Sequence, residues 1–326
     1  MYLSVFLHPF CPPILSGSHA RHTFDRALRT LPPSLHARIW VRYLLWAEQK
    51  GSTTMVFVYR RYLAVDPSVT ERFATLLLSP ITSQPRPLEA AKLLLSLARK
   101  ASRGEYTSPE GKSPYQLLED WIDVVEKFAE EVGFDVDQTI DANKALDEGE
   151  AAREPEPAPP SDEDEDPTSP RKLNIEKIIQ KDGLVVYKDQ AGRLWTGLAT
   201  YWIKRGEFDR AKETFEQGIK SVLTIRDFTQ IFDAYAEFGE SLVSALMTSL
   251  ENEEDETEED VAETERELDA RIAEFEDLTD RRPFLVNDVL IRRNPNDVQE
   301  WEKRVALWGE DDEKVRPPSP TFISSS

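Results

Sequence analysis

Aromatic residues recur at every third position in the segment that most constrains the fold of this chain. Trp40, Tyr43 and Trp46 follow one another at this spacing, with Glu48 shortly after them, and residues 232–240 repeat the pattern as Phe-x-x-Tyr-x-x-Phe-x-Glu. Because an α-helix turns by about 100° per residue, three aromatics at this spacing form a stripe roughly 120° wide. A stripe of that width is typical of a helix face turned toward a core. Each segment therefore predicts a helix with a buried aromatic face.

The stretches that flank the first aromatic helix also repeat, at an offset of 35 residues. Proline at the end of each stretch indicates that one helix stops and another begins. The repeating unit is therefore a hairpin of two helices, about 34–37 residues long. One hairpin cannot cover its own aromatic stripe, so we expect the hairpins to stack. The residues related by the offset are Phe24 and Tyr59, Arg26 and Arg61, Leu28 and Leu63, and Pro32 and Pro67.

Weaker copies of the aromatic pattern extend this array toward the C-terminus. One copy begins at Trp195 and a degenerate one at Trp301. We predict an all-α fold, an α-solenoid (superhelix) of TPR-like helix hairpins with two disordered acidic insertions. The positions expected in the core of the repeats are Phe24, Leu28, Trp40, Tyr43, Trp46, Tyr59, Leu63, Trp121, Trp195, Tyr201, Phe215, Phe232, Tyr235, Phe238 and Trp301.

The net charge of −21 is concentrated in two short runs. Residues 147–166 hold ten acidic residues and one basic residue, and residues 251–267 hold eleven and one. Charge runs of this kind are usually solvated segments. The second half of the later run favours a helix that leads into Leu268, Ile272 and Phe275. An acidic balance of this size does not favour sequence-independent binding to nucleic acid.

These patterns divide the chain into seven segments. Proline, glutamate and aspartate mark the first insertion, and the tail is polar and rich in proline. The expected segments are a disordered leader at 1–17, repeats at 18–145, a disordered insertion at 146–171, repeats at 172–247, an acidic loop at 248–266, repeat helices at 267–308 and a disordered tail at 309–326.

The leader superficially resembles a secretory signal but lacks its main features. No lysine or arginine precedes the apolar stretch, and Pro9, Pro12 and Pro13 interrupt it. The chain also has no run of 18 apolar residues, so we predict no membrane span. The leader is expected to be disordered or to reflect a wrongly chosen start.

Few residues are suited to catalysis or metal binding. The chain has one cysteine, Cys11, and its four histidines all lie within the first 36 residues. A zinc site with paired cysteines is therefore excluded. We predict that the protein is not an enzyme and needs no cofactor, metal ion or small-molecule ligand.

One segment resembles a phosphate-binding loop because it ends in Gly111-Lys112-Ser113. Six residues separate Gly104 from Gly111, whereas the phosphate loop needs four so that its N–H groups converge on a phosphate. Pro109 also lacks an N–H group. We interpret the segment as an inter-helix loop, with Ser113 as the N-cap of the next helix and a proline in its first turn.

Two serines and three pairs of arginines remain as sites of modification or binding. Ser161 precedes an acidic stretch and Ser169 precedes a proline, so both are candidate phosphorylation sites. Arginine pairs at 60–61, 281–282 and 292–293 suit contacts with RNA or with acidic partners.

The aromatic helix with its glutamate, followed by Arg-x-x-Phe-x-Arg-Ala-Leu and proline, resembles the half-a-tetratricopeptide (HAT) repeat. Within that class, the chain is similar to the family of the pre-mRNA-splicing factor Syf-one, called XPA-binding protein two in animals. The resemblance covers about residues 20–308, apart from the insertion at 146–170. The stretches that carry it are Thr23–Pro32, Val58–Leu63, Gly111–Leu117, Arg193–Trp195, Thr224–Phe238, Arg281–Leu285, Val289–Pro295 and Glu300–Leu307.

The resemblance implies a non-enzymatic scaffold of the spliceosome's NineTeen complex, located in the nucleus. Its partners would be other proteins of that complex, including a crooked-neck-like HAT protein, while direct contact with RNA stays open. Family members are longer, so we expect a fragment or a truncated gene model. The alternatives are a nuclear adaptor in transcription-coupled DNA repair or RNA 3′-end processing, and a tetratricopeptide-like module that binds peptide tails. The last would need a clamp of lysine and arginine, which the sequence does not identify.

Overall fold

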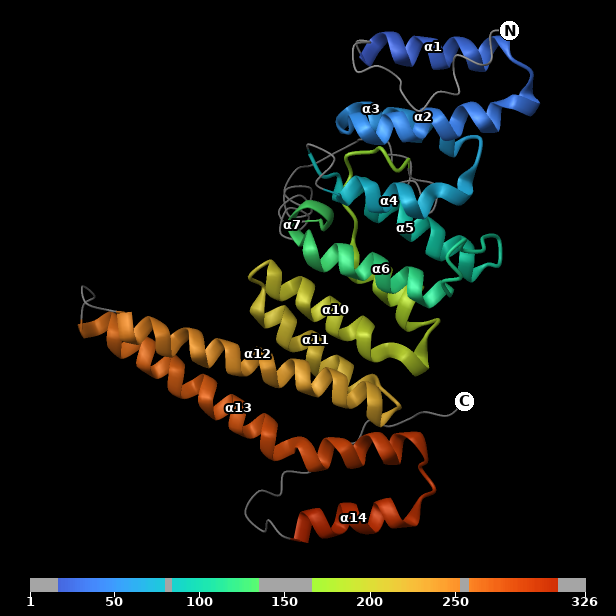
Figure 1. Ribbon diagram of the computed structural model, residues 1–326. Helices are drawn as coiled ribbons and strands as arrows, with labels where there is room; N and C mark the ends of the chain where they lie inside the picture. The colour runs from blue at the N-terminus through green and yellow to red at the C-terminus, as the bar shows by residue number, and fades with distance from the viewer. Residues whose placement is uncertain (1–16, 80–83, 135–165, 253–257, 310–326) are drawn as a thin grey trace, which may run out of the picture. The chain divides into compact units, whose positions relative to one another are not determined.

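The computed structural model describes residues 17–79, 84–134, 166–252 and 258–309, and the regular elements in these ranges are all helical (Figure 1). The predicted all-α fold is confirmed. The chain forms two compact units. Unit 1 comprises residues 1–124 and 135–172, and unit 2 comprises residues 125–134 and 173–326. None of the helices in the described ranges has the length and apolar character that a membrane span requires.

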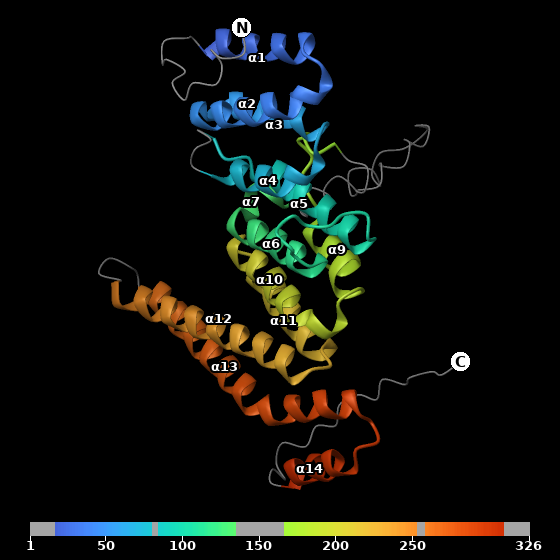
Figure 2. The same cartoon turned by 45° about the vertical axis from the view of Figure 1, so that its right-hand side comes forward.

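Unit 1 is a series of antiparallel helices in chain order. The two views of the molecule show α1, the α2–α3 pair and the α4–α5 pair lying one after another (Figures 1 and 2). Its helices are α1 (Gly17–Thr30), α2 (His36–Lys50), α3 (Ser52–Leu63), α4 (Thr70–Leu78), α5 (Pro87–Ser102) and α6 (Pro114–Lys127), whose last turn belongs to unit 2.

Local chemistry fixes where these helices begin and end. Gly51 follows α2 with a φ of 61°, and its N–H donates to the Ala47 carbonyl at 2.9 Å. Glycine adopts this left-handed conformation without a steric cost, so the chain can turn directly into α3. At α6, Gln116 N–H donates to Ser113 Oγ at 3.2 Å while Ser113 N–H donates to Gln116 Oε1 at 2.8 Å. This reciprocal pair is a capping box, as expected from the serine and proline at that position.

Unit 2 contains shorter helices at its start and longer ones toward its end. The Asn174 side chain caps the short helix Ile175–Ile178 by accepting from Lys177 N–H at 3.1 Å. Its elements are α7 (Ala129–Val132), α9 (Ile175–Ile178), the π-helix η3 (Ile179–Leu184), the 3₁₀ turn η4 (Lys188–Gln190), α10 (Ala191–Lys204), α11 (Phe208–Ser221), α12 (Ile225–Asn252), α13 (Glu258–Arg293) and α14 (Val298–Gly309).

Close packing of α10 on α11 depends on a glycine. A Cβ atom added at Gly218 would lie 3.0 Å from Cγ of Trp195 and 3.2 Å from Cδ1 of Ile231. Both distances are shorter than ordinary van der Waals contact. The missing side chain therefore lets the indole of α10 and a side chain of α12 meet the backbone of α11.

The second acidic run is largely helical, which corrects the predicted loop at 248–266. Helix α12 continues to Asn252 and α13 begins at Glu258, so residues 253–257 are the part of this run outside the described residues. Glutamate and alanine have high helix propensity. The Arg271 guanidinium also lies 3.5 Å from Glu267 and 3.2 Å from Glu274 on the same helix. Pairs at these spacings offset part of the repulsion among the carboxylates.

The predicted insertion at 146–171 ends earlier than expected. Residues 135–165 lie outside the described residues, as do 1–16 and 310–326, which hold nearly all of the predicted leader and tail. Residues 166–171 are described and form a turn. Its Asp166 carboxylate accepts from Thr168 N–H at 2.9 Å, and Lys92 Nζ on α5 donates to the Ser169 carbonyl at 3.0 Å. An aspartate followed by proline and threonine favours such a turn, which the acidic composition concealed.

Candidate protein-interaction surface

The first repeat junction in unit 1 brings together three helices. Phe24 of α1 stacks on Tyr43 of α2, with ring centroids 4.6 Å apart and planes inclined by 14°. The next residue, Asp25, accepts from Tyr43 Oη at 3.3 Å and from Arg61 of α3 at 2.6 Å. The Arg61 guanidinium also lies 5.8 Å from the ring centre of Trp40. Apolar stacking and a half-buried ion pair therefore hold α1, α2 and α3 together.

The surroundings of Tyr43 in this junction change the pKa of its hydroxyl group. Burial, together with the nearby Asp25 carboxylate, raises the pKa of Tyr43 to about 12. The hydrogen bond to Asp25 in turn raises the pKa of Arg61. Tyr43 therefore stays neutral, and Asp25 and Arg61 stay paired, throughout the physiological pH range.

Unit 2 contains the same junction between α11, α12 and α13. Phe215 stacks on Tyr235 with ring centroids 5.0 Å apart and planes inclined by 11°. The following residue, Glu216, accepts from Arg281 at 3.0 Å, and the neighbouring Arg282 lies 4.9 Å from the ring centre of Phe232. Burial, together with the carboxylate of Glu216, raises the pKa of Tyr235. Two separate repeats thus use the same stacking and the same pairing of charges.

A further aromatic contact joins α3 to α4 within unit 1. Tyr59 stacks on Phe73 with ring centroids 5.4 Å apart and planes inclined by 5°. The Tyr59 hydroxyl donates to Glu48, the glutamate that ends the aromatic pattern of α2, and Arg72 donates to the same carboxylate at 2.7 Å. That glutamate therefore links one repeat to the next.

The structure places the residues expected in the repeat core in three groups. Phe24, Leu28, Trp46 and Leu63 are half-buried. The expectation for Trp301 is wrong: its side chain is 48% exposed, and its Nε1 donates to the Pro295 carbonyl at 2.9 Å. Val298 and Val305 lie about one turn before and one turn after Trp301 on α14, and both are exposed. The buried group consists of Trp40, Tyr43, Tyr59, Trp121, Trp195, Tyr201, Phe215, Phe232, Tyr235 and Phe238.

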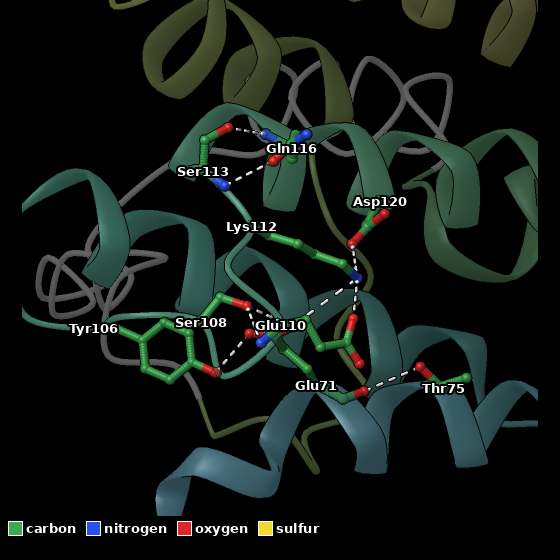
Figure 3. A network of polar contacts seen from close by, with 9 residues as sticks. All are labelled: Glu71, Thr75, Tyr106, Ser108, Glu110, Lys112, Ser113, Gln116 and Asp120. Atoms are coloured by element: carbon green, nitrogen blue, oxygen red, sulfur yellow. Dashed lines mark hydrogen bonds and ion pairs between the residues drawn. The ribbon is translucent and has the colours of Figure 1, made fainter.

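The segment with the Gly-Lys-Ser sequence forms an ordered loop between α5 and α6 (Figure 3). The Glu71 carboxylate of α4 lies buried beneath it and accepts from Tyr106 Oη at 2.7 Å and from Ser108 Oγ at 3.1 Å. Lys112 Nζ lies 3.1 Å from Glu110 and 2.8 Å from Asp120. A lysine engaged by these carboxylates is not free to hold a phosphate. The contacts fasten the loop to two helices instead.

The described residues offer little for metal chemistry. Within the described ranges, no group of three or more His, Cys, Asp or Glu side chains could hold a metal ion. Two hollows lie within unit 2, one beside Phe275 among α11, α12 and α13 and another beside Leu290 between α13 and α14. Ser161, the first candidate phosphorylation site, lies outside the described residues. Ser169, the second, is half-buried in the turn at 166–171, where its Oγ accepts from Arg171 N–H at 3.3 Å.

Exposed apolar side chains lie on α2 and α3 of unit 1. Val41 and Leu45 of α2 are 55% and 45% exposed, and Phe57 of α3 is also exposed. The Arg21 guanidinium lies 5.4 Å from the ring centre of Phe57. A helical array with exposed apolar and basic side chains has the composition of a protein-binding surface.

Two family models match this chain. The "Pre-mRNA-splicing factor SYF1 middle HAT repeat" matches residues 162–318, and the "Pre-mRNA-splicing factor Syf1/CNRKL1 N-terminal HAT repeat" matches residues 14–68. The chain belongs to the Syf1 family of HAT-repeat proteins. The family resemblance identified from the sequence is therefore confirmed, as is the predicted fold, an α-solenoid of HAT repeats.

Individual Syf1 proteins resemble the chain along most of its length. It is 51% identical to pre-mRNA-splicing factor SYF1 of Mycosarcoma maydis, over 96% of this chain and 34% of that protein. It is 39% identical to syf1 of Neurospora crassa, over 91% of the chain and 31% of the relative. Identity to the human SYF1 is 36%, over 89% of the chain and 28% of the relative. The chain spans about a third of the length of these relatives.

Sequence reasoning found the aromatic rings of this Syf1-family chain but not the charged residues beside them. It identified Phe24 and Phe215, yet it overlooked that an acid follows each, as Asp25 and Glu216. It assigned the arginines at 60–61 and 281–282 to contacts with RNA or acidic partners, although Arg61 and Arg281 are half-buried and pair with acids of their own chain. The recurrence of an acid directly after the stacked phenylalanine was the available signal.

Proposed function

We propose that this chain is a non-enzymatic scaffold in pre-mRNA splicing, a component of the NineTeen complex that holds other splicing proteins on its HAT-repeat surface. The observation that carries the proposal is the repeated junction, in which a stacked phenylalanine and tyrosine are braced by an acid and an arginine. Such junctions build an extended array with many shallow contact sites. The splicing-factor relatives support the same role.

The proposed partners are spliceosomal proteins, among them a crooked-neck-like HAT protein, and the proposed location is the nucleus. A scaffold needs rigid spacing between its contact surfaces more than it needs a deep pocket. The aromatic stacks and ion pairs at the junctions supply that spacing, because each fixes the position of one helix against the next.

Affinity purification of the tagged chain from nuclear extract tests the proposal, with both proteins and small nuclear RNAs identified. We expect NineTeen-complex proteins together with spliceosomal RNAs. Recovery of repair or 3′-end-processing factors alone would instead favour the adaptor role. Recovery of neither set by a chain whose circular dichroism shows it to be folded would refute the scaffold role of this segment.

A paired variant makes the test specific to the array. Tyr43→Asp and Tyr235→Asp place a charge inside one junction each, and we expect each to reduce recovery of the partners that bind its own unit. Thr53→Asp is the matched control, because Thr53 is exposed on α3. Equal recovery by all three variants would show that the partners do not depend on the junctions.

A further inference from the structure

The charge of this acidic chain is unevenly distributed, and helices α1–α3 are basic. Residues 17–63 contain eight lysines and arginines but two acids, whereas the whole chain has a net charge of −21. Seven of the eight basic residues are arginines. Arginine is enriched and lysine depleted in protein interfaces. The net charge of this segment is therefore opposite in sign to that of the remainder, and its cations are almost all arginine.

Neither acid of this segment neutralises its outer surface. Asp25 is engaged by Arg61 and Tyr43, and Glu48 by Arg72 and Tyr59. Both carboxylates are thus used inside the junctions. The basic residues that face outward keep their charge available.

The outer face of α2 combines such cations with aliphatic side chains. At 100° per residue, Arg38, Val41, Arg42, Leu45 and Gln49 fall within an arc of about 100°, and all five are exposed. Within the described part of the chain, the side chains of Arg38 and Arg42 make no hydrogen bond or ion pair. Val41 and Leu45, 55% and 45% exposed, lie one helical turn apart along one side of the two arginines. We call these five residues the α2 face.

We propose that the α2 face is the docking site for an acidic amphipathic helix of another protein. This rests on the proposed scaffold role and names the kind of partner that one surface takes. Aspartate or glutamate residues of the partner pair with Arg38 and Arg42, and its aliphatic side chains cover Val41 and Leu45. A helix suits the face because its residues at i and i+4 match the one-turn spacing of both pairs.

The aliphatic residues favour a protein over RNA. A phosphate backbone would satisfy Arg38 and Arg42, but it would leave Val41 and Leu45 facing water. Recognition of single-stranded RNA relies on stacking of bases against aromatic rings, and the α2 face presents none. A partner with both acidic and aliphatic groups contacts both arginines and both aliphatic side chains of the face.

A photo-crosslinking amino acid placed at residue 41 tests the proposal in the full chain. The variant Val41→p-benzoylphenylalanine is irradiated in nuclear extract, and the crosslinked segment is identified by mass spectrometry. The matched control carries the same amino acid at Val186 of unit 2, which is also 55% exposed. We expect a product at position 41 but not at 186, with the crosslink in a segment that is net acidic and has aliphatic residues at i and i+4.

Charge reversal supplies the second arm. Arg38→Glu with Arg42→Glu should lower the yield of that product at least ten-fold. Arg226→Glu with Arg293→Glu, two exposed arginines of unit 2, should leave it unchanged. Both double variants should keep the circular dichroism spectrum and melting temperature of the parent chain, because none of the four side chains is buried.

Several results would overturn the proposal. The crosslink at position 41 could join RNA, residues 1–16 or 147–166 of the same chain, or a second copy of the chain. The yield of the crosslink could also stay unchanged after charge reversal, or fail to exceed that of the Val186 control. If the parent chain still recovers splicing proteins in any of these cases, the scaffold role stands and the docking assignment fails. If the acidic helix is found but no splicing proteins are recovered, the docking assignment stands and the scaffold role fails.

Discussion

The junction of α1–α3 in unit 1 and that of α11–α13 in unit 2 solve one packing problem with different arginines. In unit 1, Arg61 alone pairs with Asp25 and lies against the ring of Trp40. In unit 2 the two tasks are divided, since Arg281 pairs with Glu216 and Arg282 lies against Phe232. The exposed fractions of the paired side chains are nearly equal, 39% and 18% in the first junction and 39% and 21% in the second.

The difference shows that the repeat preserves a geometry of contacts more strictly than the identity of each residue. The stacked rings keep nearly the same separation in both junctions, while the acid changes length and the cation changes position. A junction that concentrates two contacts in one side chain is more sensitive to loss of that side chain.

Removal of the stacked phenylalanine should damage unit 2 more than unit 1. Phe215 is buried, whereas Phe24 is half-buried. Phe215→Ala should cost about 3–5 kcal/mol of stability, the usual range for an aromatic removed from a core, and Phe24→Ala about 1–2 kcal/mol less. Hydrogen exchange of the amides in α11 and α1 reports the two units separately. Equal losses would show that burial does not separate the two junctions.

Alkaline pH should weaken the first junction through Tyr43. Its pKa is raised to about 12, so the folded state favours the neutral phenol. The stabilisation is complete below the unfolded pKa of about 10 and is lost as pH rises toward 12, by up to about 2 kcal/mol. The measurement is the free energy of unfolding in urea at pH 8 and at pH 11.5. Tyr43→Phe should show a shallower fall, whereas the same fall in both proteins would exclude Tyr43 as its source.

Loss of a single arginine should destabilise the junction of unit 1 more than that of unit 2, because Arg61 makes both contacts that Arg281 and Arg282 divide between them. Arg61→Ala removes both the ion pair and the contact with Trp40, and we expect a cost of about 1–2 kcal/mol. Arg281→Ala removes the pair with Glu216 but no ring contact, and Arg282→Ala removes the ring contact but not that pair. The further pairs of Arg281 with Asp277 and of Arg282 with Asp233 involve exposed carboxylates and contribute little, so each variant should cost about half as much as Arg61→Ala. Thermal unfolding of the three variants at low and high salt measures the difference. A larger loss for Arg281→Ala than for Arg61→Ala would contradict the comparison.

The smallest effect is expected at Trp301. Because this indole is 48% exposed, Trp301→Ala should change the free energy of unfolding by less than about 1 kcal/mol. Trp301 nevertheless begins its copy of the aromatic pattern, as Trp40 begins the first copy. Trp40→Ala is the matched comparison and should cost several times more. Similar melting temperatures for the two variants would mean that Trp301 is covered in solution.

The sequence was sufficient for the parts of the fold that depend on periodicity. Spacing of three identified the aromatic faces around Tyr43 and Tyr235, and the serine and proline at 113–114 identified the start of α6. The acids that follow Phe24 and Phe215 were visible in the sequence, but the partner of each, such as Arg61 for Asp25, was not predictable, because these residues approach one another only after the helices pack. The helical part of 248–266 was underestimated, since acidic composition concealed helix propensity. Trp301 was placed wrongly because periodicity shows which face is apolar, not whether another element covers it.

Gly218 has a consequence for the spacing of repeats. The equivalent position in the first junction is Ala27, three residues after Phe24 as Gly218 is three residues after Phe215. The two repeats therefore differ by one methyl group at this position. Where the methyl is absent, Trp195 and Ile231 meet the backbone of α11. The distance between neighbouring helices therefore depends here on whether the residue carries a methyl group. Gly218→Ala would push α11 away from Trp195 and Ile231, tilting α11 and changing the direction in which the following helices propagate.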